Sequence, residues 1–177
     1  MGNYLDYAAT TPVHSEVLKV ITKEMASFGN PSSVYRIGRE QKQKIERVRK
    51  AILKELQASP HDAVIFTSSG SEGNNLVFES IRKHYEKEKG HIIVSAVEHP
   101  SVRKSAEFLE QEGFDVTYLA PNREGSIDVS AVEKALREDT RLVSIMTVNN
   151  ETGARFPIEE IAALLKETPT YFHTDAV

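Results

Sequence analysis

Four groups of polar residues follow directly after short apolar stretches of the chain. They are His99, Asp175, the pair Asn149 and Asn150, and a run of hydroxyl residues and glycine at 67–71. An imidazole can stack on a flat ring or transfer protons near neutral pH, and a buried carboxylate can hold a positive charge. Hydroxyl and amide groups supply hydrogen bonds. These residues could therefore form one binding site, provided that the fold brings them to the same place.

The first group is Thr67-Ser68-Ser69-Gly70-Ser71-Glu72, a turn that leads into a predicted helix. Free N–H groups and the positive end of a helix dipole make such a turn a cup for an anion, most naturally a phosphate. It is neither a Walker A loop nor a dinucleotide fingerprint, because the glycine spacing differs and no Gly-Lys-Ser/Thr occurs. Ser69 and Glu72 also form a capping-box pattern, which would explain the turn without any ligand.

The other groups each have a simple structural alternative. His99 lies between an apolar stretch and the helix-starting Pro100, and a lone histidine is often structural. Asn149 and Asn150 could merely form a turn. A metal site would take His99, His173 and Asp175, but the sequence lacks the local histidine spacing that is typical of such sites, so no metal is expected.

Apolar periodicity predicts the elements that must position these groups. Helical spacing covers about 13–28 and 33–56, and after that strands and helices alternate. The predicted strands are 63–67, 92–95, 116–119, 142–147 and 171–174, and the later predicted helices follow 70, 100, 129 and 157. Nearly continuous apolar strands that alternate with helices are typical of an α/β fold, a three-layer αβα arrangement with a mostly parallel sheet. In such sheets, binding residues lie at the carboxyl ends of the strands.

Composition excludes several classes of function. The 177 residues carry 22 Lys and Arg against 26 Asp and Glu, a net charge of −4, which argues against direct binding of nucleic acid. Cysteine is absent, so the chain has no disulfide, zinc-thiolate site or thiol nucleophile. The sequence shows no signal-peptide pattern and no apolar run near the roughly 20 residues that span a bilayer. A cytoplasmic protein without membrane contact is expected.

A phosphate cup, a histidine, an amide and a buried acid match what pyridoxal 5'-phosphate requires. The cofactor needs an anion cradle, a group that stacks on its ring, a hydrogen bond to the ring oxygen and a carboxylate for the pyridine nitrogen. It also needs a lysine for covalent attachment. No lysine follows a predicted strand here, so we expect that lysine to lie beyond Val177.

The chain resembles the N-terminal half of cysteine desulfurases of the NifS/IscS type, which are fold-type I, class V aminotransferase-like enzymes. The resemblance rests on motifs that occur in the family's order: 4–12, 29–33, 66–75, 98–99, 148–153 and 173–176. It implies that Gly70 and Ser71 hold the phosphate and that His99 stacks on the ring and moves protons. It further implies that Asn150 meets the phenolic oxygen and that Asp175 pairs with the ring nitrogen.

The resemblance also implies the organisation of the protein and its reaction. Residues 1–14 would be a segment of the small domain, and 15–177 an incomplete large pyridoxal-phosphate-binding domain. The family converts L-cysteine to L-alanine as a homodimer, and passes persulfide sulfur to an acceptor protein for iron–sulfur cluster assembly or tRNA thiolation. The persulfide cysteine and the attachment lysine would lie outside this chain, so we expect it to be inactive alone. The alternatives are a selenocysteine lyase, another class V aminotransferase and a non-catalytic half-fold scaffold.

Overall fold

The structure is a computed structural model that describes residues 3–7 and 9–177. It divides into two compact units, the first ending at Phe66 and the second beginning at Thr67. The first unit contains helices α1 (Ser15–Met25) and α2 (Arg36–Glu55). No residue of α1 is buried, and only Gly38 is buried in α2. A Cβ at Gly38 would lie 2.5 Å from the Asn30 carbonyl oxygen, so this close approach requires glycine.

The second unit is built on a parallel sheet of four strands in the order β2-β1-β3-β4. The strands are β1 (His91–Ser95), β2 (Asp115–Leu119), β3 (Thr140–Ser144) and β4 (Tyr171–His173). The helices between and before them are α3 (Gly70–His84), α4 (Pro100–Gln111), α5 (Val129–Ala135) and α6 (Ile158–Leu165). Because all neighbouring strands are parallel, their carboxyl ends lie at one edge of the sheet.

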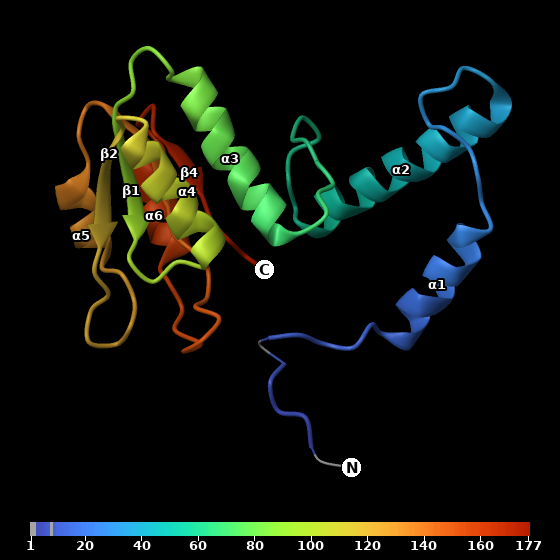
Figure 1. The fold of residues 1–177 in the computed structure, drawn as a ribbon, viewed down its shortest axis with the longest axis horizontal. Coiled ribbons are helices and arrows are strands. Elements are labelled where there is room, and N and C mark those ends of the chain that lie inside the picture. The colour runs from blue at the N-terminus through green and yellow to red at the C-terminus, as the bar shows by residue number, and fades with distance from the viewer. Residues whose placement is uncertain (1–2, 8) are drawn as a thin grey trace. The chain divides into compact units, whose positions relative to one another are not determined.

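Two cores cover the two faces of this sheet, and the alternation of side chains along β1 separates them. Ile92 and Val94 belong to the core under α3 and α4, together with Phe78. Ile93 belongs to the other core, which lies under α5 and α6. Helices α3 and α4 therefore cover one face, and α5 and α6 the other, as Figure 1 shows. The predicted three-layer α/β fold with a parallel sheet is confirmed.

One predicted strand is wrong. Residues 63–67 form no regular secondary structure, and no strand in the described part of the chain pairs with them. A strand needs hydrogen-bonding partners, whatever its side-chain pattern. Here the segment is held instead by Arg49, whose Nε donates to the Val64 carbonyl at 3.1 Å. Ile65 and Phe66 remain exposed, as expected for an apolar segment without a partner strand.

The remaining predicted elements form, with ends that differ by a few residues. The largest difference is at the helix that begins at Gly70, which is predicted to extend to about Lys89 but ends at His84. The third strand of the sheet, predicted to extend to Thr147, ends at Ser144. Across the described ranges 3–7 and 9–177, no helix combines the length and apolar character needed to cross a membrane. The domain boundary expected near residue 14 stays a prediction.

Candidate functional site

The hydroxyl-rich turn at the start of α3 is held by its own side chains. Ser69 is the N-cap residue, and its hydroxyl accepts a hydrogen bond from the Glu72 N–H at 3.2 Å. The Glu72 carboxylate accepts from the Ser68 N–H and hydroxyl, at 2.5 and 2.6 Å, which lowers the pKa of Glu72. The predicted capping interaction is therefore formed, with Glu72 reaching one residue further back than in the usual capping box.

Capping leaves two donors at this helix end free. The Gly73 N–H donates to the Ser69 carbonyl and the Glu72 N–H to the Ser69 hydroxyl. The N–H groups of Gly70 and Ser71, the first helical residues, have no acceptor among the described residues. They point along the helix axis, where the dipole favours a negative charge. The capping and anion-binding interpretations are thus compatible, because they use different donors.

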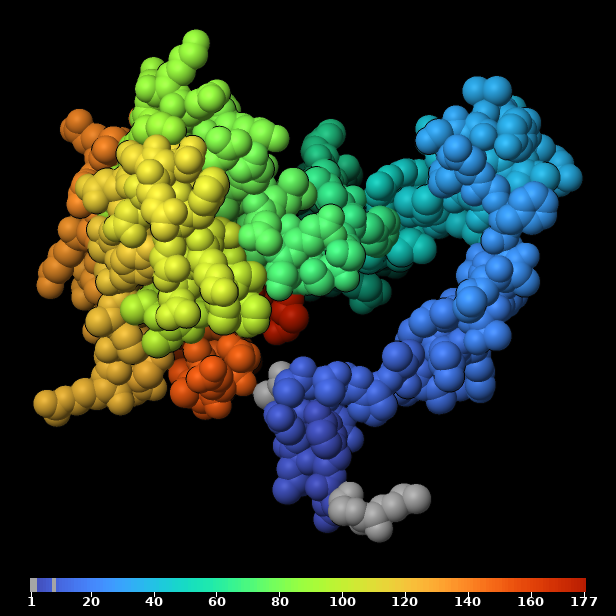
Figure 2. Space-filling model, viewed as in Figure 1, coloured from blue at the N-terminus to red at the C-terminus, as the bar shows by residue number. Residues whose placement is uncertain are grey.

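Gly70 also lies close to the last residues of the chain. A Cβ at Gly70 would approach Val177 Cγ2 to 2.6 Å, so a larger residue would displace this neighbour. Figure 2 shows the red C-terminal atoms against the start of the green helix α3. The predicted phosphate cup and the segment that carries Asp175 are therefore adjacent.

Asp175 follows β4 and is hydrogen-bonded to α3 through a buried amide. The Asn74 side-chain Nδ2 donates to Asp175 Oδ2 at 2.8 Å, and Asn74 is only 5% exposed. The backbone carbonyl of Asp175 accepts from the Thr147 N–H at 2.9 Å, which extends the pairing of β3 with β4 past their ends. Asp175 Oδ1 accepts from the Val177 N–H at 3.1 Å. The carboxylate thus has a fixed orientation.

His99 is the N-cap residue of α4, and its ring is fixed at Nδ1. This atom accepts from the Ser101 N–H at 3.2 Å and lies 2.8 Å from the Ser101 hydroxyl. Asn74 Nδ2 also donates to the Ser101 hydroxyl, at 2.9 Å. Asn74 and Ser101 therefore connect His99 to Asp175, two residues that the sequence places far apart.

Asn150 is exposed, whereas its neighbour Asn149 is buried and shapes the turn after β3. Asn149 Oδ1 accepts from the N–H groups of Glu151 and Thr152, at 3.0 and 2.9 Å. Its Nδ2 donates to the Val97 carbonyl at 3.0 Å, which ties this turn to the one that carries His99. Asn149 thus places Asn150 at the same sheet edge as the other candidates.

Glu98 lies between these turns and is 6% exposed. Its Oε1 accepts from the Met146 N–H at 2.8 Å, while Oε2 is buried and has no hydrogen-bond partner among the described residues. Burial raises the pKa of Glu98 to about 7, against the opposing effects of the Met146 N–H and the nearby Ser95 hydroxyl. The negative charge of Asp175 raises it further. At neutral pH, a large fraction of Glu98 therefore carries a proton.

His173, which was considered as a metal ligand, makes a different contact. Its Nδ1 lies 2.8 Å from the Ser144 hydroxyl, and its ring packs edge-on to Phe78. Burial lowers the pKa of His173, which favours the neutral ring. Within the described residues, no three His, Asp or Glu side chains gather closely enough to hold a metal ion.

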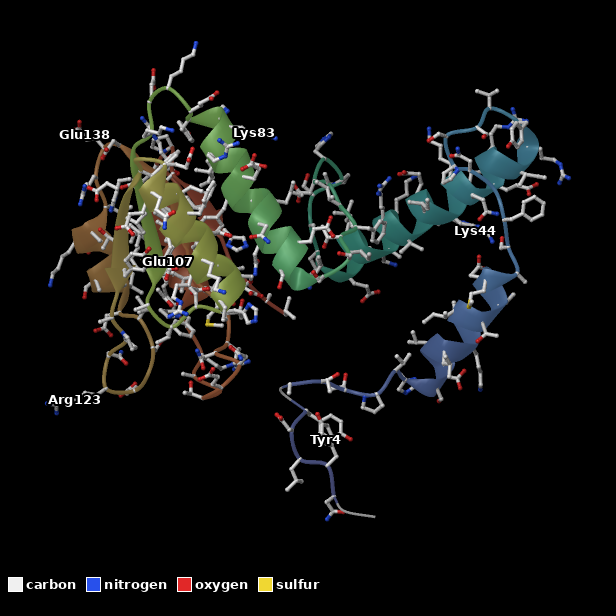
Figure 3. The ribbon with its side chains drawn as sticks, viewed as in Figure 1. Tyr4, Lys44, Lys83, Glu107, Arg123 and Glu138 are labelled. Carbon is white, nitrogen blue, oxygen red and sulfur yellow. The ribbon has the colours of Figure 1, made fainter. Side chains whose placement is uncertain are left out.

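An open groove of about 790 Å³ lies beside the site rather than in it. It runs between the loop after β2 and the start of α6, and Thr147 and Phe156 are among its lining residues. Arg123, labelled in Figure 3, belongs to that loop and is exposed. None of the five residues predicted to hold the cofactor lines this groove.

The residues that the structure adds to the sequence prediction are all internal supports. Asn74 and Ser101 contact Asp175 and His99, Glu98 binds the Met146 N–H, and none of these three was given a role from the sequence, whereas Asn149 forms the turn that the sequence offered as its structural alternative. A signal for Asn74 exists, because it occupies the same helical stripe as the buried Phe78 and Ile81. A polar residue at an apolar position of a stripe indicates a buried hydrogen bond.

This arrangement fits pyridoxal phosphate by the chemistry of its donors and acceptors. The free N–H groups of Gly70 and Ser71 suit a phosphate, and the oriented Asp175 carboxylate suits a protonated ring nitrogen. These groups have the donors and acceptors that the cofactor requires, and Asn74 and Ser101 connect Asp175 with His99.

Comparison with known proteins identifies the family of the chain and several of its relatives. The family described as aminotransferase class-V matches residues 3–177. The cysteine desulfurase IscS of Dictyoglomus turgidum is 48% identical over 177 residues, covering 98% of this chain and 44% of the relative. The mitochondrial cysteine desulfurase of Candida maltosa is 43% identical, covering 98% of this chain and 36% of the relative. The chain thus spans less than half the length of these curated relatives.

Two solved structures extend the similarity to the fold. The structure titled "SspA in complex with cysteine" has a TM-score of 0.93 and 41% identity, covering 99% of this chain and 50% of that one. A NifS-like protein has a TM-score of 0.93 and 34% identity, covering 100% of this chain and 49% of that one. The match over residues 3–177, together with these similarities to cysteine desulfurases and NifS-like proteins, shows that the chain belongs to the aminotransferase class-V family.

Proposed function

We propose that the chain forms the part of a pyridoxal-phosphate-dependent cysteine desulfurase that binds the phosphate and the ring of the cofactor. The observation that carries the proposal is the hydrogen bond from Asn74, in the first turns of α3, to Asp175 after β4. It joins a helix end with two free N–H donors to an oriented carboxylate. A phosphorylated ring with a basic nitrogen needs this pair of groups.

Each predicted residue has a defined task in this proposal. Gly70 and Ser71 bind the phosphate through their N–H groups, and the Ser71 hydroxyl adds a donor. Asp175 keeps the ring nitrogen protonated, and His99 stacks on the ring. Asn150 donates to the phenolic oxygen. Bound pyridoxal phosphate supplies an electron sink for bonds that break next to the amino group of the substrate.

The substrate and partners follow from the relatives. Those compared above are named as cysteine desulfurases, and one solved relative is titled as a complex with cysteine, which supports L-cysteine as the substrate. The complete protein would release L-alanine and pass persulfide sulfur to an acceptor protein, as a cytoplasmic homodimer. The attachment lysine and the persulfide cysteine would come from outside the 177 residues, so the chain alone would be inactive.

Binding of pyridoxine 5'-phosphate tests the proposal, because this analogue lacks the aldehyde that reacts with surface lysines. We expect the 177-residue chain to bind it, and Asp175→Asn to weaken the affinity by about 10- to 100-fold, the usual effect of losing a charged hydrogen-bond partner. Titration calorimetry gives the dissociation constant.

Asp139→Asn is the matched control, since Asp139 precedes β3 and therefore lies at the opposite edge of the sheet. It should leave the affinity unchanged. Equal affinities for wild type and Asp175→Asn would remove Asp175 from the site. Absence of binding by the wild-type chain would count against the proposed function as a whole.

A further inference from the structure

One buried amide in the site uses both of its hydrogens. The Asn74 side-chain Nδ2 donates to Asp175 Oδ2 at 2.8 Å and to the Ser101 hydroxyl at 2.9 Å. The orientation of this amide is fixed, because its carbonyl oxygen would repel the Asp175 carboxylate. Both hydrogens are thus committed, one to each neighbour.

The direction of the next hydrogen bond follows from this. The Ser101 oxygen already accepts from Asn74, so its own hydrogen is free to donate, and the nearest partner is His99 Nδ1 at 2.8 Å. The backbone N–H of Ser101 also points at His99 Nδ1, at 3.2 Å, and a backbone N–H can only donate. Two donors therefore face the same ring nitrogen.

We propose that Asn74 and Ser101 are positioning residues that hold the neutral His99 ring as its Nε2–H tautomer and tie its position to that of Asp175. The neutral ring has one N–H and one acceptor nitrogen, and the two donors make Nδ1 the acceptor. In its neutral form His99 thus presents an N–H donor at Nε2, and its acceptor nitrogen Nδ1 is occupied. It acts on the ligand as a hydrogen-bond donor through Nε2, and Nδ1 is not available to take a proton from the ligand.

This inference rests on the proposed function for the ligand that His99 and Asp175 would meet, but not for the hydrogen bonds themselves. If His99 stacks on the ring and Asp175 pairs with the ring nitrogen, one amide sets the spacing of both groups. Movement of Asn74 would then displace both together.

Long-range ¹H–¹⁵N correlation spectra of the ligand-free 177-residue chain report the tautomer directly. At about pH 8.5, we expect the neutral His99 ring of wild type to carry its proton on Nε2. His99→Gln identifies the signal. Ser101→Ala should shift the tautomer ratio toward Nδ1–H by about two- to tenfold, the effect of losing one net hydrogen bond. Ser101→Thr, which keeps the hydroxyl, should restore it.

Ser105→Ala is the matched control. Ser105 lies one turn further along α4, and its hydroxyl bonds to Asn75 and to the Ser101 carbonyl rather than to His99. It should leave the tautomer unchanged. Asn74→Leu should change the signals of His99 and of the Asp175 carboxyl together, while those of Ile93 and Val143 in the core stay in place.

Three results would overturn the proposal. They are a wild-type His99 ring with its proton on Nδ1, equal effects of Ser101→Ala and Ser105→Ala, and an Asn74→Leu variant that alters only one of the two groups. Because the ligand is absent, none of these outcomes depends on the affinity for pyridoxine 5'-phosphate. A failure of the proposed positioning of His99 by Asn74 and Ser101 is thereby distinguished from a failure of the proposed function.

Discussion

Replacement of Glu98 by glutamine isolates the energetic effect of a buried carboxyl group. Glutamine has nearly the same shape, and its side-chain oxygen can still accept the hydrogen bond from the Met146 N–H. It cannot ionise. The free energies of unfolding of wild type and Glu98→Gln should therefore differ mainly by the cost of ionising Glu98 in the folded chain.

The size of the effect follows from the pKa of Glu98, which burial raises from 4.5 to about 7. Each pKa unit corresponds to about 1.4 kcal/mol, so ionisation in the folded state costs about 3 kcal/mol once the pH exceeds both values. Because the folded pKa is the higher one, the stability that the protonated Glu98 carboxyl contributes is fully present below pH 4.5 and is lost as the pH rises through 7. Because glutamine cannot ionise, the Glu98→Gln variant should not lose this part of its stability as the pH rises over that range.

Native-state amide exchange of Ile93 and Val143 measures the free energy of unfolding of the sheet that carries Glu98. We expect wild type and Glu98→Gln to be similar near pH 4, and the variant to be more stable by about 3 kcal/mol near pH 8. Glu133→Gln, an exposed acid on α5, is the control and should show no such pH dependence. A difference between wild type and Glu98→Gln that stays constant from pH 4 to 8 would refute the reasoning.

Two further predictions concern the stability of the second unit. Burial lowers the pKa of His91, so the unfolded chain takes up a proton more readily and stability should fall as the pH drops below about 6.5; His91→Gln should flatten this slope in urea titrations. A slope unchanged in His91→Gln would contradict this. Ser69→Ala removes the N-cap of α3 and should lower the free energy of unfolding by about 1 kcal/mol in the same assay. Ser71→Ala, which removes a hydroxyl from the same helix but no cap, should change it little, and equal losses would argue against the cap.

Much of the fold could be predicted from the sequence because its signals are local. Apolar strands such as 92–95, and helix starts such as Pro100, depend on residues that are close together in the chain. The segment at 63–67 has the same apolar pattern and forms no strand, because pairing depends on a partner elsewhere. Side-chain pattern shows which residues suit a strand, but not which strands are available to pair.

The site shows the same division. Gly70, His99 and Asp175 follow predicted strands or start predicted helices, so their positions at one sheet edge could be predicted. The roles of Asn74 and Glu98 could not, because each depends on a contact with a distant residue. An asparagine in a helix and a glutamate in a turn are unremarkable until their burial is known.

The hydrogen bond between Asn74 and Asp175 joins residues that are 101 positions apart in the chain. Closing a segment of that length has an entropic cost that only the assembled sheet can offset, and parallel strands cannot form from neighbouring residues alone. The complete site can therefore exist only in molecules in which β4 has joined β3. Ligand affinity at this site would then serve as a kinetic marker for completed folding, with partly folded chains remaining silent.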